Sequence, residues 1–297
     1  MQIINEMELP SYVQSAVTIG KFDGIHIGHK KLLERISGCR ERGLTPVAVA
    51  FVMDGRHIYT GQEIRPLFEE NGIEVLIEYE FDDRIRNMSP EQFVKEILID
   101  RLNARFVCVG DDFRFGCNRE GDTSVLTNLG MKYGIDVEII DREKIDGEIV
   151  SSTRIRSMLD EGNVSEVSRL LGRNYSVSGE VVHGRRLGRT LGFPTVNLDV
   201  TDDKYIPSNG VYASYVTYGT KRFASVTNIG VKPTVKGNNK VGIETYIFDF
   251  GSEIYGEDIK VELVDFLRKE TKFDSLEALK EQIDIDKDKA RSVLQSE

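Results

Sequence analysis

Residues 17–33 read VTIGKFDGIHIGHKKLL, and this stretch decides the fold of the first half of the chain. It begins with apolar residues, continues with a loop that holds three glycines, and ends with leucines at helical spacing. The stretch therefore predicts a strand, a tight loop and the start of a helix. Such a loop turns backbone N–H groups and the positive end of the helix dipole toward one point, which suits a phosphate group.

Two of the four histidines in the chain, His26 and His29, lie in this loop. A neutral imidazole donates one hydrogen bond, and an imidazolium donates two and adds a positive charge. A pair of imidazoles at a helix N-terminus can therefore bind a phosphoryl group as negative charge grows on it. The alternatives are a metal site or two surface histidines. The chain has no GxxxxGK(S/T) loop, so it is not a P-loop nucleotidase.

The rest of the first half alternates strands and helices. Strands are predicted at residues 46–53, 73–77, 106–109 and 137–140, and a helix at residues 90–102. This alternation predicts a parallel, doubly wound sheet, in which ligands bind at the carboxyl ends of the strands. Residues 109–122, VGDDFRFGCNREGD, follow one of these strands. They are either a ligand-binding loop or a solvated acidic turn with core aromatic residues.

A third element, residues 150–159 (VSSTRIRSML), predicts a helix with Arg154 and Arg156 in its first turn. Arginine normally avoids a helix N-terminus because the helix dipole is positive there. A nearby anion such as a triphosphate explains both residues. The alternative is an ordinary linker helix with solvated arginines. The helical pattern continues over residues 157–171 and ends at Gly172.

Beyond Gly172 the pattern changes to short β-branched segments separated by turn residues. These segments are residues 176–182, 211–216, 223–228, 242–250 and 259–263. They predict an antiparallel barrel or sandwich. Residues 266–294 predict an amphipathic C-terminal helix.

Residues 180–198, EVVHGRRLGRTLGFPTVNL, combine three glycines with three arginines, a composition that suits phosphate binding. Thr195 and Asn197 follow on one strand face, and their oxygens suit Mg²⁺. The alternative is a hydrogen-bonded Thr/Asn pair. Glu244, on a later strand, can accept a proton from a hydroxyl that attacks a γ-phosphorus. The alternative for Glu244 is an exposed strand carboxylate.

Composition excludes several classes of protein. The net charge is −10, with 39 Lys and Arg against 49 Asp and Glu, so the chain lacks the basic excess of a nucleic-acid binder. No apolar run approaches a membrane span, and the N-terminus does not read as a signal peptide. The three cysteines lack zinc-site spacing and predict reduced thiols in a cytoplasmic protein.

Several motifs together resemble one family. Residues 17–33 resemble the (T/S)xGxFDGxHxGH signature of the nucleotidyltransferase superfamily. Residues 109–122 resemble VGxDFRFGxxRxGD, and residues 151–156 resemble SSTxIR. In the second half, residues 188–197 resemble the riboflavin kinase motif GRxLGFPTAN, and residues 266–283 resemble FLRxExKFxSLExLxxQI. In this order, over nearly the whole chain, the motifs resemble those of the bacterial bifunctional riboflavin kinase/FAD synthetases.

The resemblance implies two domains. Residues 1–172 would form an α/β Rossmann-like nucleotidyltransferase domain with a parallel sheet, which adenylylates FMN to FAD. Residues 173–297 would form an antiparallel β-barrel riboflavin kinase domain with a C-terminal helix, which phosphorylates riboflavin to FMN. The implied partners are ATP, riboflavin, FMN and FAD, with Mg²⁺ accompanying ATP and flavins serving as substrate and product. Neither a nucleic acid nor a membrane is implied, and self-association is expected to be weak.

The resemblance also implies residue roles. In the adenylyltransferase site the catalytic residues would be His26, His29 and Arg154, and the flavin-binding residues would be Asp112 and Phe113. The nucleotide there would be bound by Gly20, Phe22, Asp23, Gly24, Gly28, Ser152, Thr153 and Arg156.

In the kinase site Glu244 would be the catalytic base, and Thr195 and Asn197 would be the metal ligands. The nucleotide would be bound by Gly184, Arg185, Gly188, Arg189 and Gly192, and the flavin by Asn209, Gly210 and Arg268. For Arg268 the alternative is a surface arginine that caps a loop.

The chain departs from the family pattern at two places. Residues 51–61, FVMDGRHIYTG, replace a TF-x-PHP-like turn, and no role is assigned to His57. Tyr246 replaces the histidine of an E-x-H pattern that begins at Glu244. The first departure leaves an alternative open, namely a flavin- and nucleotide-binding protein in which only the kinase half is active.

Overall fold

The computed structural model describes residues 1–297 except 6–7, 11–12, 81, 185–192, 233–239 and 296–297. The chain forms two compact units. The first contains residues Met1–Gly55 and Thr60–Ser151, and the second contains Arg56–Tyr59 and Ser152–Glu297. Four residues from the first half of the sequence thus belong to the second unit. The boundary predicted after residue 172 concerns the two catalytic domains and stays a prediction.

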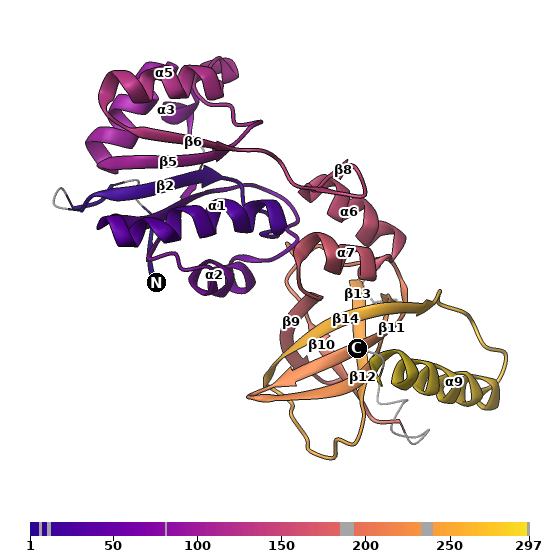
Figure 1. The fold of residues 1–297 in the computed structure, drawn as a ribbon. Helices are drawn as coiled ribbons and strands as arrows, with labels where there is room; N and C mark the ends of the chain where they lie inside the picture. Colours follow the sequence, from indigo (N-terminus) through magenta and orange to yellow (C-terminus); the bar gives the residue numbers. More distant parts are fainter. Residues whose placement is uncertain (6–7, 11–12, 81, 185–192, 233–239, 296–297) are drawn as a thin grey trace. The chain divides into compact units, whose positions relative to one another are not determined.

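The first unit is built on a six-stranded parallel sheet in the order β1-β4-β3-β2-β5-β6. Figure 1 shows its neighbouring strands β2, β5 and β6. Its strands are β1 (Gln2–Ile4), β2 (Ser15–Gly20), β3 (Thr45–Val52), β4 (Val75–Glu80), β5 (Ala104–Gly110) and β6 (Asp136–Ile140). A small hairpin, β7 (Lys144–Ile145) and β8 (Glu148–Ile149), follows β6. The parallel α/β prediction is confirmed.

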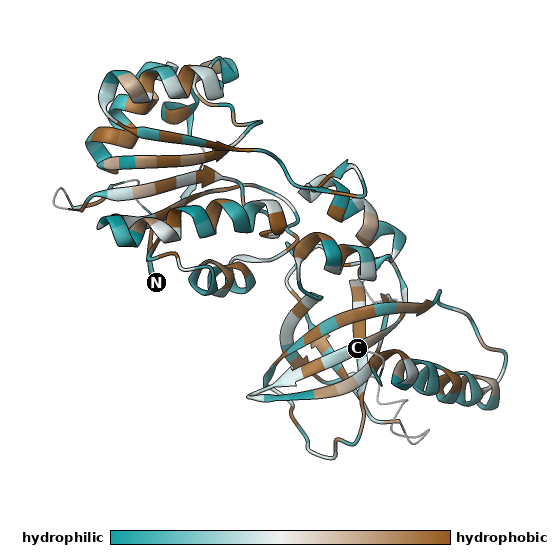
Figure 2. Ribbon diagram, viewed as in Figure 1, coloured by the Kyte–Doolittle hydropathy of each residue, from teal (hydrophilic) through white to brown (hydrophobic). Residues whose placement is uncertain are grey.

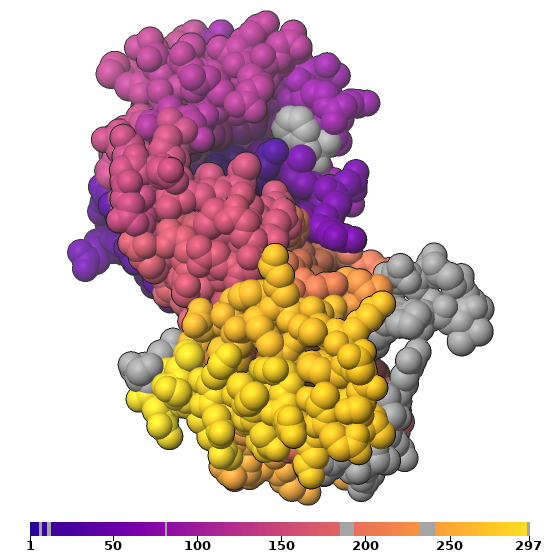
Figure 3. Space-filling view, turned by 90° about the vertical axis from the view of Figure 1, so that its right-hand side faces the viewer, coloured from indigo at the N-terminus to yellow at the C-terminus, as the bar shows by residue number. Residues whose placement is uncertain are grey.

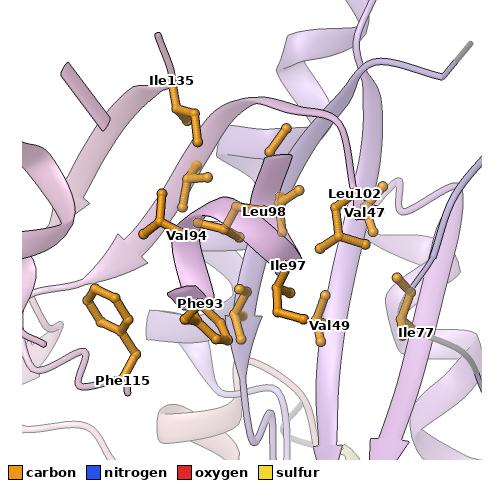
Figure 4. Packing of buried hydrophobic residues seen from close by; sticks show 14 of the residues in the cluster. Val47, Val49, Ile77, Phe93, Val94, Ile97, Leu98, Leu102, Phe115 and Ile135 are labelled. Atoms are coloured by element: carbon orange, nitrogen blue, oxygen red, sulfur yellow. The ribbon is translucent and has the colours of Figure 1, made fainter. Parts of the chain in front are cut away.

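Helices cover both faces of this sheet. They are α1 (Ile27–Ser37), η1 (Gly38–Arg42), α2 (Gly61–Glu70), α3 (Asp83–Arg86), α4 (Pro90–Gln92), η2 (Phe93–Arg101), η3 (Cys117–Arg119) and α5 (Thr123–Tyr133). The helix predicted at residues 90–102 is present, but its main part, η2, is wound as a π-helix. In Figure 4, Phe93, Ile97 and other buried side chains of η2 pack against strand residues such as Val49. Helices α1 and α2 contribute to a second core on the other face of the sheet.

The second unit contains a closed antiparallel barrel in the order β10-β13-β12-β11-β14-β9. Helices α6 (Ser152–Glu161) and α7 (Val164–Leu171) precede strands β9 (Tyr175–Val182), β10 (Thr195–Asp199), β11 (Gly210–Tyr218), β12 (Lys221–Lys232), β13 (Lys240–Ile247) and β14 (Asp258–Arg268), and helix α9 (Leu276–Gln295) ends the chain. The prediction of a barrel with a C-terminal helix is confirmed. The C-terminal stretch, yellow in Figure 3, covers much of this unit on the face in view.

Two helix predictions in this half need correction. The helix expected over residues 157–171 is divided, because Gly162 takes a φ of +79° and Asn163 caps the start of α7 with its side chain. The C-terminal helix begins at Leu276 and not near Phe266, because the stretch up to Arg268 pairs with β11 as part of β14. For residues 266–268, the packing gained by pairing with a neighbouring strand outweighs the helical spacing of their apolar side chains.

Side chains on the barrel strands alternate between an inner and an outer face. Inside, the hydroxyl of Ser214 lies 2.8 Å from those of Ser225 and Thr227, and Thr227 lies 2.9 Å from Thr245. All four hydroxyl groups are buried and satisfy one another. On the outer face, α9 packs its Ala290 and Leu294 against Val211, Val264 and other apolar residues. In Figure 2, α9 accordingly carries both hydrophobic and hydrophilic residues.

Candidate functional sites

The loop between β2 and α1 is held in an unusual backbone conformation. Phe22 and Ile25 adopt positive φ angles of 48° and 41°, a region that non-glycine residues rarely occupy. Both side chains are fully buried, so packing stabilises the conformation. Phe22 contacts the ring of His29 at a centroid distance of 5.2 Å. The loop is therefore a fixed scaffold that sets the position of the histidines.

His26 and His29 are stacked, with their ring centroids 3.7 Å apart and their planes 15° apart. His26 is the N-cap of α1, because its Nδ1 accepts a hydrogen bond from the His29 N–H at 3.3 Å. In its neutral form His26 therefore carries its proton on Nε2. The predicted proximity of the two imidazoles at a helix N-terminus is confirmed by this geometry.

The environment of His29 keeps its ring neutral. Burial lowers the pKa of His29 well below the usual value for an imidazole, and the neighbouring His26 lowers that pKa further. The Nδ1 atom of His29 is buried and has no hydrogen-bond partner among the described residues. A bound polyanion would reverse the balance, because it favours the protonated imidazoles and offers acceptor oxygens.

Two glycines of this loop lie against its aromatic rings. A Cβ atom on Gly28 would lie 3.2 Å from Nδ1 of His26, and one on Gly20 would lie 3.4 Å from the ring of Phe22. Gly24 has a φ of 92°, which favours glycine. The geometry of the loop therefore accounts for the presence of glycine at these three positions. The nucleotide-binding roles predicted for them, and for Asp23, stay predictions.

The second loop, which follows β5, is tied to the end of β6. Arg142 donates from Nε to Oδ1 of Asp111 at 2.7 Å, and its Nη1 lies 3.9 Å from Oδ2 of Asp112. Phe113 and Phe115 stack with centroids 5.5 Å apart; Phe115 is buried in the core and Phe113 is partly buried. The core-aromatic interpretation thus holds for Phe115. Flavin binding by Asp112, which is exposed, and by Phe113 stays a prediction.

Helix α6 belongs to the second unit and carries the two predicted arginines. Arg154 donates from Nη2 to Oε1 of Glu166 at 2.8 Å, and both side chains are mostly buried. Arg156 donates to the carbonyl oxygen of Arg56 at 3.1 Å and lies over the ring of Tyr205. Glu166 is therefore an anionic partner that the sequence pattern did not reveal. Phosphate binding by Arg154, Arg156, Ser152 and Thr153 stays a prediction.

Strand register in the barrel brings the predicted kinase residues together. Asn197 of β10 pairs with Glu244 of β13, which pairs on its other side with Asn228 of β12. Directly paired residues of antiparallel strands present their side chains to the same face, with Cβ atoms about 4.5–5.5 Å apart. Thr195 lies two residues from Asn197 and pairs with Tyr246. Thr195, Asn197 and Glu244 therefore share one outer face of the barrel.

A cavity of about 300 Å³ opens over this face. It is lined by Phe193, Thr195, Val211, Val226, Asn228, Glu244, Tyr246, Arg268, Glu270, Thr271, Phe273, Leu279, Ile283 and Asp286. Its walls are mainly apolar and aromatic, and its polar groups converge from β10, β12, β13 and β14. This combination is typical of a site for a small aromatic ligand.

A buried ion pair holds the cavity wall to the C-terminal helix. Arg268, at the end of β14, donates from Nε and Nη2 to both carboxylate oxygens of Asp286 at 2.8–3.0 Å. Asp286 is 3% exposed and also accepts from Gln282 at 2.9 Å. Arg268 is thus no solvated surface arginine. Asp286 could not be identified from the sequence, because it is one of several acidic residues on a charged amphipathic helix.

Two glycines near the cavity make room for specific neighbours. A Cβ atom on Gly184 would lie 2.6 Å from Cγ of Asn197, and one on Gly210 would lie 2.7 Å from the carbonyl oxygen of Arg268. Glycine is thus required at position 184 because a side chain there would clash with Asn197, a predicted metal ligand. Asn209 is exposed. The nucleotide-binding residues predicted at Arg185, Gly188, Arg189 and Gly192 lie outside the described residues.

The described residues contain neither a cluster of metal-binding side chains nor a helix that could cross a membrane. No group of three or more His, Cys, Asp or Glu side chains among them could hold a metal ion. Among the helices of this part of the chain, none combines the length and the apolar character needed to span a bilayer.

Comparisons with known proteins agree on both halves of the chain. A riboflavin kinase family profile matches residues 171–294, and an FAD synthetase profile matches residues 10–154. A bifunctional riboflavin kinase/FMN adenylyltransferase of Pseudomonas fluorescens is 35% identical over 96% of this chain and 94% of its own length. The enzyme of the same name from Escherichia coli K12 is 36% identical over 93% and 91%.

A crystal structure from Streptococcus pneumoniae has a similar fold throughout. It superposes with a TM-score of 0.88 and 30% identity, and the match covers 97% of this chain and 98% of that one. Its title describes a macrolide-efflux protein. The match shows that the whole two-unit architecture occurs in another bacterial protein.

Proposed function

The chain belongs to the bifunctional riboflavin kinase/FMN adenylyltransferase family, and from this membership we propose how its residues divide the two reactions. The protein is a transferase that phosphorylates riboflavin to FMN and then adenylylates FMN to FAD, using one ATP in each step. No observation favours the alternative in which only the kinase half is active. The residue roles that follow are our proposal.

The kinase reaction is proposed to take place on the outer barrel face that carries Glu244. The ribityl 5′-hydroxyl attacks the γ-phosphorus of ATP, its proton passes to the Glu244 carboxylate, and ADP leaves. The observation that supports this role is the strand register, which sets Glu244 between Asn197 and Asn228. A positioned carboxylate acts mainly by orienting the hydroxyl and accepting its proton.

Thr195 and Asn197 are proposed to hold Mg²⁺ together with the ATP phosphates. Their hydroxyl and amide oxygens are hard ligands on the same face as Glu244, which fits a small cation that keeps several other ligands. When bound, Mg²⁺ would neutralise charge on the transferred phosphoryl group. Gly184, Arg185, Gly188, Arg189 and Gly192 are proposed to contact the nucleotide.

The flavin ring is proposed to enter the cavity beneath helix α9. Phe193 and Tyr246 form an edge-to-face pair at its wall with centroids 6.0 Å apart, and Lys287 lies 4.5 Å from the Phe193 ring. Such aromatic walls suit a planar ring system. Arg268, fixed by Asp286, is proposed to donate to the ligand, with Asn209 and Gly210 as further contacts.

The adenylyl transfer is proposed to use the paired histidines. A phosphate oxygen of FMN attacks the α-phosphorus of ATP, the bond to the β-phosphate oxygen breaks, and pyrophosphate leaves. His26 and His29 stabilise the growing charge, because a triphosphate raises the basicity of imidazoles that burial keeps neutral. Arg154 and Arg156 are proposed to bind the leaving pyrophosphate, and Gly20, Phe22, Asp23, Gly24, Gly28, Ser152 and Thr153 to position the nucleotide. Asp112 and Phe113 are proposed to contact the flavin.

A pair of variants tests this division. His29→Ala should abolish FAD formation and leave FMN formation intact, whereas Glu244→Gln should stop FMN formation while added FMN is still adenylylated. Each variant serves as the control for the other, since both proteins contain the same two sites. Loss of both activities in either variant would contradict the assignment of the reactions to separate residues.

Two further properties concern the location and the self-association of the protein. The absence of zinc-like cysteine spacing and the acidic composition fit a cytoplasmic protein without a nucleic-acid partner. Self-association is proposed to be weak, and light scattering across a range of protein concentrations tests it. A stable oligomer at low concentration would contradict this proposal.

A further inference from the structure

A short segment of the first half of the sequence, residues 56–59, is built into the second unit. We call these residues (Arg56, His57, Ile58 and Tyr59) the strap. The chain leaves the first unit at Gly55, forms the strap and returns to the first unit at Thr60. Ile58 is fully buried and Tyr59 is 3% exposed, so the strap is part of the core of the second unit.

Backbone hydrogen bonds attach the strap to the segment that precedes β11. The His57 N–H donates to the carbonyl oxygen of Asp203 at 2.6 Å, and the Tyr205 N–H donates to the carbonyl oxygen of His57 at 2.8 Å. His57 and Lys204 thereby form a β-bridge. The strap is thus held through its main chain as well as its side chains.

Lys204 is the central contact of the strap. Its side chain is 2% exposed, and its ammonium group donates to the carbonyl oxygens of Ile58 at 2.8 Å and Ser176 at 2.7 Å. The same nitrogen lies 4.4 Å from the ring centroid of Tyr59 and 4.6 Å from that of Tyr175. A buried ammonium group placed in this way joins the strap to β9 by hydrogen bonds and cation–π contacts.

The strap also contacts one group of residues proposed for adenylyl transfer. Arg156 of α6 donates to the Arg56 carbonyl oxygen at 3.1 Å. On this side, the strap therefore helps to set the position of the arginine that is proposed to bind pyrophosphate. The contact lies entirely within the second unit.

The return of the chain connects the strap to the histidine loop. Thr60, the next residue, caps α2 through a capping box with Glu63. From α2, Phe68 packs edge-to-face on Phe22 at 5.4 Å, and Phe22 contacts His29 at 5.2 Å. The first unit therefore resumes directly after the strap, at the cap of the helix whose Phe68 packs on Phe22.

We propose that Lys204 is a positioning residue for FMN adenylylation, although it belongs to the unit that contains the kinase barrel. It anchors the strap, and the strap positions Arg156 through the carbonyl oxygen of Arg56. This inference rests on the role proposed above for Arg156. Neither Lys204 nor the strap lines the cavity that contains Glu244, so we expect the kinase reaction to be spared when this contact is lost.

The test replaces Lys204 with methionine in the full-length protein, with Lys221→Met as the matched control. Methionine keeps an unbranched apolar chain between Tyr59 and Tyr175 and removes both hydrogen bonds. Lys221 is an exposed lysine at the start of β12 in the same unit. Both activities are measured in each protein, with kcat and KM for ATP determined separately.

We expect Lys204→Met to lower kcat/KM for FMN adenylylation by roughly tenfold to a hundredfold, the usual result of a misplaced catalytic group. Riboflavin phosphorylation should stay within about twofold of the control, since its site is not touched. Adenylylation equal to that of Lys221→Met would overturn the proposal. So would a parallel fall of both activities, because that result indicates general unfolding.

A second variant, Ile58→Ala, and a second measurement, the rate of trypsin cleavage after Arg56, test the same proposal independently. Ile58→Ala loosens the strap without changing any residue of the barrel, and it should show the same selective loss. Trypsin cleavage after Arg56, which releases residues 1–56, should be about tenfold faster in Lys204→Met than in the control, because cleavage requires local opening. Equal cleavage rates would show that Lys204 does not hold the strap. This readout stands even if the roles proposed for His29 and Arg156 are wrong.

Discussion

Replacing Gly184 with alanine should disable the kinase reaction and spare adenylyl transfer. Gly184 does not adopt a left-handed backbone conformation, so alanine is compatible with its main chain. The added methyl group, however, would lie 2.6 Å from Cγ and 2.8 Å from Oδ1 of Asn197. Ordinary contacts begin at 3.4 Å, so the amide must retreat by about 0.8 Å or more. Asn197 is 6% exposed and has little room to do so.

The size of the effect follows from this displacement. A misplacement of about 1 Å in a catalytic group costs up to about 100-fold in rate, so we expect a tenfold to hundredfold loss of riboflavin phosphorylation. This loss corresponds to about 1.4–2.7 kcal/mol in the activation free energy. Overpacking should also lower the free energy of unfolding by about 1–3 kcal/mol. The assay follows FMN formation under initial-rate conditions, with adenylylation of added FMN measured in the same preparation.

The control is Gly251→Ala, because a Cβ atom at Gly251 meets nothing within 4 Å. The double variant Gly184→Ala/Asn197→Ala separates the two roles of Gly184. If the glycine only makes room for Asn197, the double variant should be no slower than Asn197→Ala alone. Full kinase activity in Gly184→Ala would show that the position of the Asn197 amide does not matter for phosphoryl transfer.

Three other outcomes are expected. Asp286→Asn removes one charge of a buried ion pair and leaves Arg268 uncompensated, so it should lower the free energy of unfolding by about 3–5 kcal/mol and raise KM for riboflavin; an unchanged midpoint of urea unfolding would contradict the structural role of the pair. The lowered pKa of His29 means that the unfolded chain takes up a proton near pH 6.5 while the folded chain does not. The free energy of unfolding should therefore fall as the pH drops below about 6.5. The slope should be up to about 1.4 kcal/mol per pH unit until the folded-state pKa is reached. His29→Gln should flatten that dependence, and an equal slope in both proteins would disprove it. Residues 152–297 expressed alone should unfold at higher temperature than residues 173–297, because α7 buries Val164, Val167, Leu170 and Leu171 within the second unit; equal melting temperatures would show that α7 contributes nothing.

The elements that the sequence predicted best are those whose local pattern and tertiary role agree. The strand, glycine loop and helix of residues 17–33 were predictable because apolar residues, glycines and helical leucines follow one another without ambiguity. The placement of Thr195 and Asn197 on one face followed from strand periodicity, and only the strand register showed that Glu244 shares that face. The barrel itself was predictable from short β-branched segments separated by turns.

The failures have a common physical cause, which is that distant contacts decided the local structure. Residues 266–268 have helical spacing, but pairing with β11 draws them into β14. The strap joins the second unit because Lys204, about 150 positions later, is buried against it. Asp286 became identifiable only when its partner Arg268 was located. A single sequence contains no direct signal for such pairs of residues.

The most direct test of the account follows radioactive phosphorus through the whole reaction. The protein is incubated with riboflavin, Mg²⁺ and ATP labelled at either the γ- or the α-phosphate, and the flavins are separated by chromatography. We expect γ-label in both FMN and FAD and α-label in FAD alone, because the first transfer moves a γ-phosphoryl group and the second an adenylyl group. Labelled FMN without any α-labelled flavin would contradict the account and leave a protein that acts only as a kinase.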